Sequence, residues 1–203
     1  NYRHTDANND LGRGPTINPG RSNRADDLMF KVYRNVTDSI GLGAGLGFNQ
    51  LGDGKTTTQP IGQFRADAKI WNGTGGVAVT REVSSDTANL IHNRISATSV
   101  GWSSAQSLTD RLAVKPAYTF KSLSDGSAAH DFQFNTEYTL LFDPKIIVGH
   151  RFRFLDYRGQ SGSGTFDPDN YYANRGFMSF YMQRPKYYAY AEAFLGHQKF
   201  VRN

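Results

Sequence analysis

Apolar residues and glycines alternate without a break from Ile40 to Phe48. Successive side chains of a β-strand point to opposite faces, so this pattern predicts a strand with one apolar face and one face that carries no side chains. A bare face is typical of a barrel wall whose outer face meets lipid while its inner face borders a lumen. Glycine-rich strands also mark places where two backbones approach closely.

Later segments repeat the alternation with charged residues in place of glycine. From 63 to 70, Phe64 and Ile70 share a face opposite to that of Arg65 and Lys69, and similar patterns occur over 112–121, 131–140 and 146–154. The charged face would point outward in a water-soluble barrel and inward in a membrane barrel. The alternation itself is compatible with both.

The lengths of the connections favour the membrane barrel. Five junctions are short and rich in turn-forming residues, at 35–38, 72–74, 108–110, 142–145 and 184–186. Between them lie longer polar connections at 8–25, 51–60, 84–94, 123–128 and 158–170. Tight turns that alternate with long loops put all the turns at one end of an up-and-down meander, as in outer-membrane barrels.

We therefore expect an all-β fold, an antiparallel up-and-down transmembrane β-barrel of about 10–12 strands, in one domain over residues 1–203. Eleven strands can be placed, the first over 1–7 and the last over 187–200, and the segment from Ser96 to Gln106 alternates least clearly. Single-chain bacterial barrels have an even number of strands, so we expect the chain to be part of a larger barrel or a barrel that lacks a strand at one end, unless one strand has been merged or split. Aromatic residues beside the tight turns, such as Trp71 and Phe142, fit an interfacial girdle.

Composition excludes several classes of protein. Hydrophobic residues make up 38% of the chain and the mean hydropathy is −0.56, so a helical membrane protein is excluded. The chain has no cysteine, which excludes disulfides, thiol catalysis and cysteine-ligated metals. The net charge of +5 fits either ordinary surface charge or an anionic partner.

The sequence contains no complete motif for catalysis or cofactor binding. No helical period follows the glycines at 41–47, and the segment 51–56 lacks the first glycine of a phosphate-binding loop. The five histidines are not paired at metal-ligand spacing, and nothing fixes a histidine beside Ser161 or Ser163. The oxygen-rich segment 167–170 fits a turn better than a calcium loop. We expect no catalytic residues, no metal and no cofactor.

Ten charged residues are predicted to line the lumen, and seven of them are basic. They are Arg65, Asp67, Lys69, Lys115, Lys121, Glu137, Arg151, Arg153, Arg175 and Glu192. They could fill a narrow barrel with salt bridges, or they could form a polar path for a hydrophilic, anionic solute. The aromatics are expected on the face opposite to the charges, which disfavours a nucleic-acid stacking platform.

The segment SGSGTFDPDNYY, from Ser161 to Tyr172, resembles the barrel domain of tetratricopeptide-repeat exopolysaccharide exporters of the cellulose and poly-N-acetylglucosamine type. The flanking segments 145–157 and 172–183 are also similar, although no 34-residue helical repeat occurs in this chain. The resemblance implies a location in the outer membrane of a Gram-negative bacterium, with membrane lipid, a hydrophilic solute or polysaccharide, and a periplasmic scaffold or envelope complex as partners. We expect the chain to form an outer-membrane channel that conducts or exports a hydrophilic solute, with an exopolysaccharide as the expected solute. The alternatives to this channel are a general porin or a structural barrel of an envelope complex, then a barrel enzyme acting on lipid and, last, a soluble binding barrel.

Overall fold

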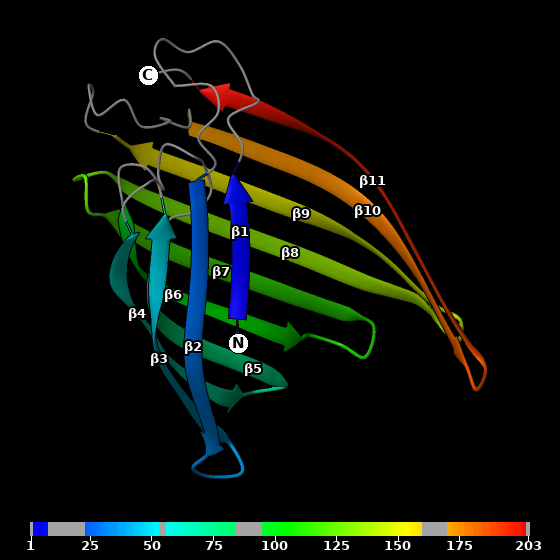
Figure 1. Ribbon diagram of the computed structural model, residues 1–203. Coiled ribbons are helices and arrows are strands. Elements are labelled where there is room, and N and C mark those ends of the chain that lie inside the picture. The colour runs from blue at the N-terminus through cyan, green and yellow to red at the C-terminus, as the bar shows by residue number, and fades with distance from the viewer. Residues whose placement is uncertain (1, 8–22, 53–55, 84–94, 160–169, 202–203) are drawn as a thin grey trace.

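The computed structural model describes residues 2–7, 23–52, 56–83, 95–159 and 170–201, and these form one antiparallel sheet. The strands are β1 (Tyr2–Ala7), β2 (Asn23–Asn35), β3 (Ile40–Gly52), β4 (Thr56–Ile70), β5 (Gly73–Val83), β6 (Ser96–Ser107), β7 (Leu112–Leu123), β8 (Ala128–Phe142), β9 (Lys145–Arg158), β10 (Asn170–Arg184) and β11 (Tyr187–Val201). Each strand pairs with the next along the chain (Figure 1). The predicted all-β, up-and-down architecture and the count of eleven strands are confirmed.

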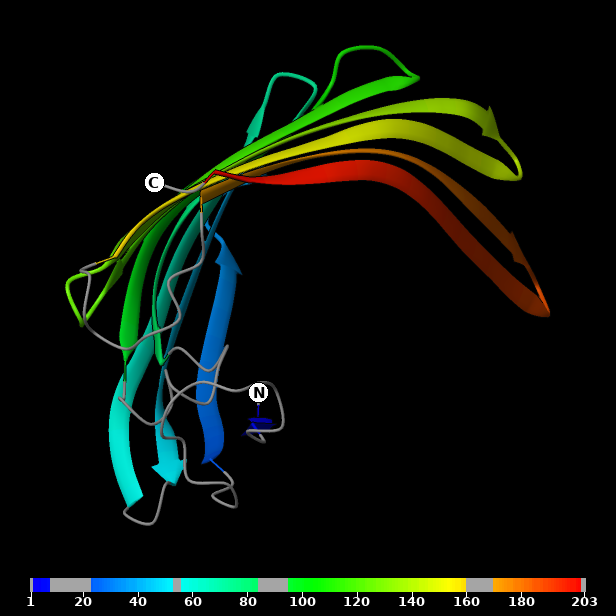
Figure 2. The ribbon, with the colours of Figure 1, turned by 90° about the horizontal axis from the view of Figure 1, so that it is seen from above.

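The sheet is strongly curved and open. Figure 2 shows it as an arch, with β1 and β11 at its two edges. Within the described residues these two edge strands do not pair with each other. The fold is therefore a curved section of barrel wall rather than a closed barrel. The described residues include no helix long and apolar enough to cross a membrane.

The tight turns lie where the sequence predicts them, at one end of the meander (Figure 1). The predicted long connection over 51–60 is wrong, because β3 continues to Gly52 and β4 already begins at Thr56. The added residues of β4 are mostly threonine, whose branched side chain favours strands although it is polar. The predicted alternation of apolar and polar residues therefore does not reveal them.

A single curved layer leaves few residues buried. One cluster of Ile95, Ala97, Leu123, Ala129 and Tyr157 lies near the loop end of β6–β9. In contrast, large apolar side chains elsewhere are open, with Leu195 86%, Leu46 77% and Phe30 73% exposed. Water-soluble monomers rarely expose a contiguous apolar surface of this extent.

Gly149 on β9 makes room for an aromatic ring on the next strand. It lies directly opposite Phe177 of β10, and a Cβ added at Gly149 would lie 2.6 Å from Phe177 Cε1 and would also meet the Thr136 carbonyl. Gly176 on β10 has no such neighbour, because the nearest atom to its added Cβ is the Leu195 carbonyl oxygen at 3.8 Å. Phe177 itself is only 7% exposed.

We predict that Gly149→Ala lowers the free energy of unfolding by about 1–3 kcal/mol, because the methyl group overfills this site. Gly176→Ala serves as the matched control and should be neutral or raise stability by up to about 1 kcal/mol, since alanine loses less entropy in a strand. Urea unfolding in detergent, followed by circular dichroism, measures both. Equal unfolding midpoints for the two variants would contradict the packing described for Phe177.

Candidate functional site on the concave face

The pairing register assigns every strand residue to one of two faces. Directly opposed residues on antiparallel strands point to the same side. One row across the sheet consists of Tyr33, Gly43, Arg65, Ala78, Gly101, Thr119, Asp131, Leu155, Tyr171 and Phe200. The adjacent row on the other side consists of Leu42, Ala66, Val77, Trp102, Tyr118, Phe132, Phe154 and Tyr172.

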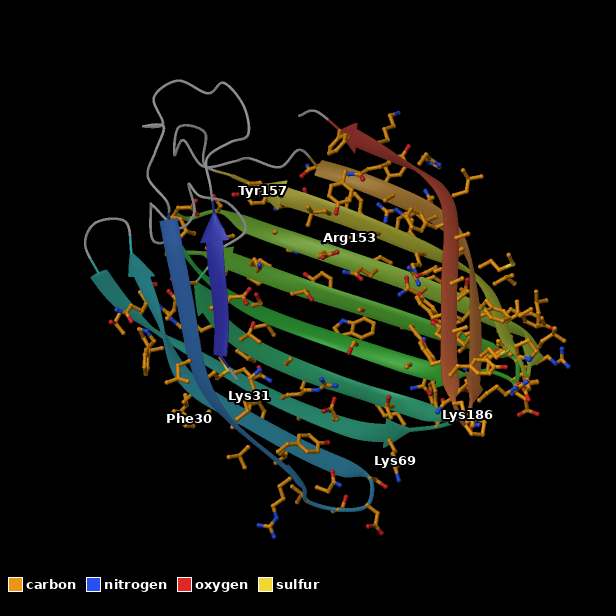
Figure 3. The ribbon with its side chains drawn as sticks, turned by 45° about the vertical axis from the view of Figure 1, so that its right-hand side comes forward. Phe30, Lys31, Lys69, Arg153, Tyr157 and Lys186 are labelled. Atoms are coloured by element: carbon orange, nitrogen blue, oxygen red, sulfur yellow. The ribbon has the colours of Figure 1, made fainter. Side chains whose placement is uncertain are left out.

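The first row belongs to the inner side of the arch, which we call the concave face. Figure 3 shows Arg153 inside the arch, and it shows Phe30 and Lys31 on opposite sides of β2. Crowding on a concave surface is also visible in the exposures, because Ala97, Ile147 and Ser179 are buried and all share this face. We call the opposite side the convex face, and most of the exposed apolar side chains lie there.

All ten residues predicted to line the lumen lie on the concave face by this register. Lys31, Glu82 and Asp131 lie on the same face and are not among the ten predicted residues. A sequence signal was present for Lys31, which lies between Phe30 and Val32, and was weaker for Glu82 and Asp131, which follow Arg81 and His130.

Most of the charged residues on the concave face form an ion pair with one partner. They are Arg65 Nε–Asp67 Oδ2 (2.6 Å), Lys115 Nζ–Glu137 Oε1 (2.6 Å), Lys121 Nζ–Glu82 Oε1 (3.4 Å), Arg151 Nη2–Glu192 Oε1 (2.6 Å) and Arg153 Nη2–Asp131 Oδ2 (2.7 Å). Lys31, Lys69 and Arg175 make no ion pair with any described carboxylate. Water-exposed pairs contribute only about 0–1 kcal/mol each, so they position side chains more than they stabilise the sheet.

Arginines and aromatic rings share the concave face of β9–β11. The guanidinium carbons lie over the rings at 4.2 Å for Arg151 and Phe177, 5.6 Å for Arg153 and Tyr171, and 5.8 Å for Arg175 and Phe194. The expectation that aromatics lie opposite the charges is therefore wrong for these strands. On β10, Tyr171 and Phe177 share the face of Arg175. On β11, small residues such as Ala191 and Ala193 occupy the convex face, and Phe194 lies on the concave one.

Glu192 connects this cluster to a second aromatic pair. Its Oε1 accepts a hydrogen bond from Arg151, and its Oε2 accepts one from the Tyr190 hydroxyl at 2.6 Å. The Tyr190 ring lies 4.8 Å from that of Tyr181. Both carboxylate oxygens are thus occupied, and this leaves donor groups and ring faces, rather than free negative charge, open to the arch.

Two hollows along β9 and β10 share Arg151 in their walls. The larger has a volume of about 630 Å³ and extends toward the turn end, past Phe177, Tyr181 and Tyr188. The smaller has a volume of about 170 Å³, and its wall contains no carboxylate. Its polar lining consists of Arg151, Arg153, Arg175, Tyr171, Gln133, Asn135 and Gln198.

The described residues do not assemble a metal site, because no three histidine, aspartate or glutamate residues gather among them. His130 shares a hydrogen bond of 2.8 Å with the Tyr118 hydroxyl on the convex face, and His197 packs against Tyr172 there. Ser161, Ser163 and the segment 167–169 lie outside the described residues, as does most of the segment that carries the family resemblance.

Comparisons with known proteins support the fold. No family model matches the chain, and no curated protein does. One solved structure, described as a bacterial polysaccharide outer membrane secretin, matches with a TM-score of 0.61 at 14% sequence identity. The match covers 86% of this chain and 72% of that one. At this identity the likeness shows a shared fold, and it does not identify this chain as a tetratricopeptide-repeat exporter.

Adjacent residues at the centre of β8 test the assignment of the two faces. The chain has no cysteine, so one introduced cysteine is a clean probe. We predict that Gln133→Cys, on the concave face, reacts with a membrane-impermeant maleimide in intact membranes, whereas Phe134→Cys does not until detergent and urea are added. Fast labelling of Phe134→Cys with protection of Gln133→Cys would reverse the assignment.

Proposed function

We propose that this chain forms part of the wall of a bacterial outer-membrane barrel that conducts or exports a hydrophilic solute, and that this solute is a polysaccharide. The observation that carries the proposal is the inverted polarity of the sheet. Its concave face holds most of the ion pairs and the hollows, whereas its convex face is mostly apolar and exposed. Lipid solvates such a convex face, and water solvates such a concave one.

The convex face supports a lipid-facing role through its continuity. The row from Leu42 through Val77, Trp102 and Phe132 to Phe154 crosses seven consecutive strands, β3–β9, without a charged residue. Apolar surface removed from water contributes about 25 cal/mol per Å², so a row of this length favours transfer into a bilayer. Trp71, in the turn between β4 and β5, is 94% exposed, as expected of an aromatic residue at the membrane–water interface.

The choice of polysaccharide rests on two likenesses. The structural neighbour is described as a polysaccharide secretin of the outer membrane. Independently, the segment from Ser161 to Tyr172 resembles a loop of the exopolysaccharide exporters. A channel for a sugar polymer, with no enzymatic activity of its own, is consistent with both similarities and with a concave face that is lined by water.

The open sheet favours a second candidate, a wall segment within a larger envelope assembly. Unpaired backbone groups at a strand edge are costly inside lipid, so spanning sheets close on themselves. β11 presents a 15-residue edge without a partner among the described residues. Further strands that pair with β1 and β11 would close the lumen, and a scaffold or second subunit could supply them.

The basic excess of the concave face predicts preference for anions. Replacing Arg151 and Arg153 together by glutamine removes two positive charges and leaves Glu192 and Asp131 without these partners, so the lumen becomes more negative. We expect the reversal potential of the full protein in a potassium chloride gradient to shift toward cation preference. The shift should weaken in high salt, since the screening length is about 10 Å at 0.1 M.

Arg81→Gln is the matched control, because Arg81 lies on β5 on the convex side and should leave the reversal potential unchanged. Planar-bilayer recording measures all three proteins. A wild-type protein without conductance, or a double variant with the wild-type reversal potential, would favour a plugged barrel with a structural role.

A further inference from the structure

The arginine–ring contacts of β9–β11 are all diagonal contacts between neighbouring strands. Each arginine lies over a ring two residues along from the position directly opposite it on the next strand, as the pairs Arg151 with Phe177, Arg153 with Tyr171 and Arg175 with Phe194 show. Diagonal neighbours of this kind lie within reach of long side chains. The result is a set of flat, cationic surfaces repeated across three strands of one face.

Among these three arginines, Arg175 is the one whose charge is not paired with a described carboxylate. Arg153 holds Asp131 through two hydrogen bonds, and Arg151 holds Glu192, but Arg175 pairs with no described carboxylate. It also lies directly opposite Arg151, whose own charge is already paired with Glu192. Gly196 lets the Arg175 stem lie flat, because an added Cβ there would be 2.7 Å from Arg175 Cγ.

Phe194 is 67% exposed on a face that faces water in the proposed channel. A phenyl ring exposed to water in such a lumen is stabilised by a ligand that has an apolar face and polar edges. The apolar face of the ligand covers the ring, and its polar edges remain in contact with water. Sugar rings have this character, since their C–H faces pack on aromatic rings and their hydroxyl groups form hydrogen bonds. The amides of Gln133, Asn135 and Gln198 in the smaller hollow can both donate to and accept from hydroxyl groups.

The site is longer than one sugar unit. The two hollows share Arg151 in their walls, and from Tyr171 to Tyr181 strand β10 rises about 33 Å at ~3.3 Å per residue. The larger hollow, at about 630 Å³, falls in the usual range for ligand sites. An extended polymer fits this path better than a compact molecule does.

We propose that the concave side of β9–β11 binds a segment of a carboxylate-bearing polysaccharide, with Arg175 paired to a carboxylate and the rings of Phe194 and Tyr171 packed against sugar faces. Guanidinium and carboxylate match in planar, bidentate geometry, which a neutral or cationic sugar cannot use. The inference rests on the proposed function, because it requires the concave face to be open to solute.

Isothermal titration calorimetry on the full protein in detergent, at low ionic strength, tests the proposal with hexagalacturonate as the acidic probe. We expect binding that Arg175→Gln weakens about tenfold, the loss of one charge-assisted contact. Arg175→Lys should recover only part of it, and Phe194→Ala should weaken binding about fivefold while Phe194→Tyr keeps it. Maltohexaose, the neutral hexamer, and sodium acetate should each bind at least tenfold more weakly than hexagalacturonate.

Lys31→Gln is the control for general charge, since Lys31 is another concave cation without a described carboxylate partner but lies on β2. It should change the affinity for hexagalacturonate less than twofold. Equal loss in Lys31→Gln and Arg175→Gln, or equal affinity for both hexamers, would overturn the proposal. Conductance by the same preparation without hexagalacturonate binding would overturn this inference alone, whereas lack of conductance would count against the proposed function.

Discussion

The register of the antiparallel pairs is the constraint on which the rest of this structure depends. Because side chains alternate with a period of two, a slip of one residue in any pairing would move a whole strand's charges to the opposite face. The observed register instead keeps the row from Tyr33 to Tyr171 on the concave face, with Arg65 and Asp131 in it, and the apolar row from Leu42 to Tyr172 on the convex face. The hollows and most of the ion pairs described above follow from that alignment.

Local alternation and turn chemistry were sufficient to predict the strands. Short junctions such as Asp143–Pro144 and Trp71–Asn72 fix where the chain reverses, so both the order of strands and the end that holds the turns could be derived. The start of β4 was missed because Thr56, Thr57 and Thr58 form a strand through β-branching and not through apolar alternation. The odd number of strands pointed to a larger barrel, but the curvature of the sheet could not be derived, since it depends on the packing of distant strands.

The candidate site was predictable one strand at a time and not as an assembly. Each of the ten charged residues could be assigned to a face by alternation within its own strand. Apart from Arg65 and Asp67 of β4, however, the ion pairs that these residues form depend on the register between strands. Arg151 reaches Glu192 across the intervening strand β10, a contact with no sequence signature. The general expectation that aromatics lie opposite the charges is wrong for β10 and β11, because these strands place rings such as Phe177 and Phe194 on the same face as their charged residues.

The central claim is that the convex face meets lipid, and Trp102 can report on it directly. The chain has two tryptophans, and Trp102 lies mid-strand on the convex face of β6, so a Trp71→Phe variant leaves it as the sole tryptophan. Its fluorescence in vesicles should be blue-shifted, quenched by lipids brominated deep in the acyl chain and insensitive to aqueous iodide. Efficient iodide quenching with no effect of brominated lipid would contradict the claim.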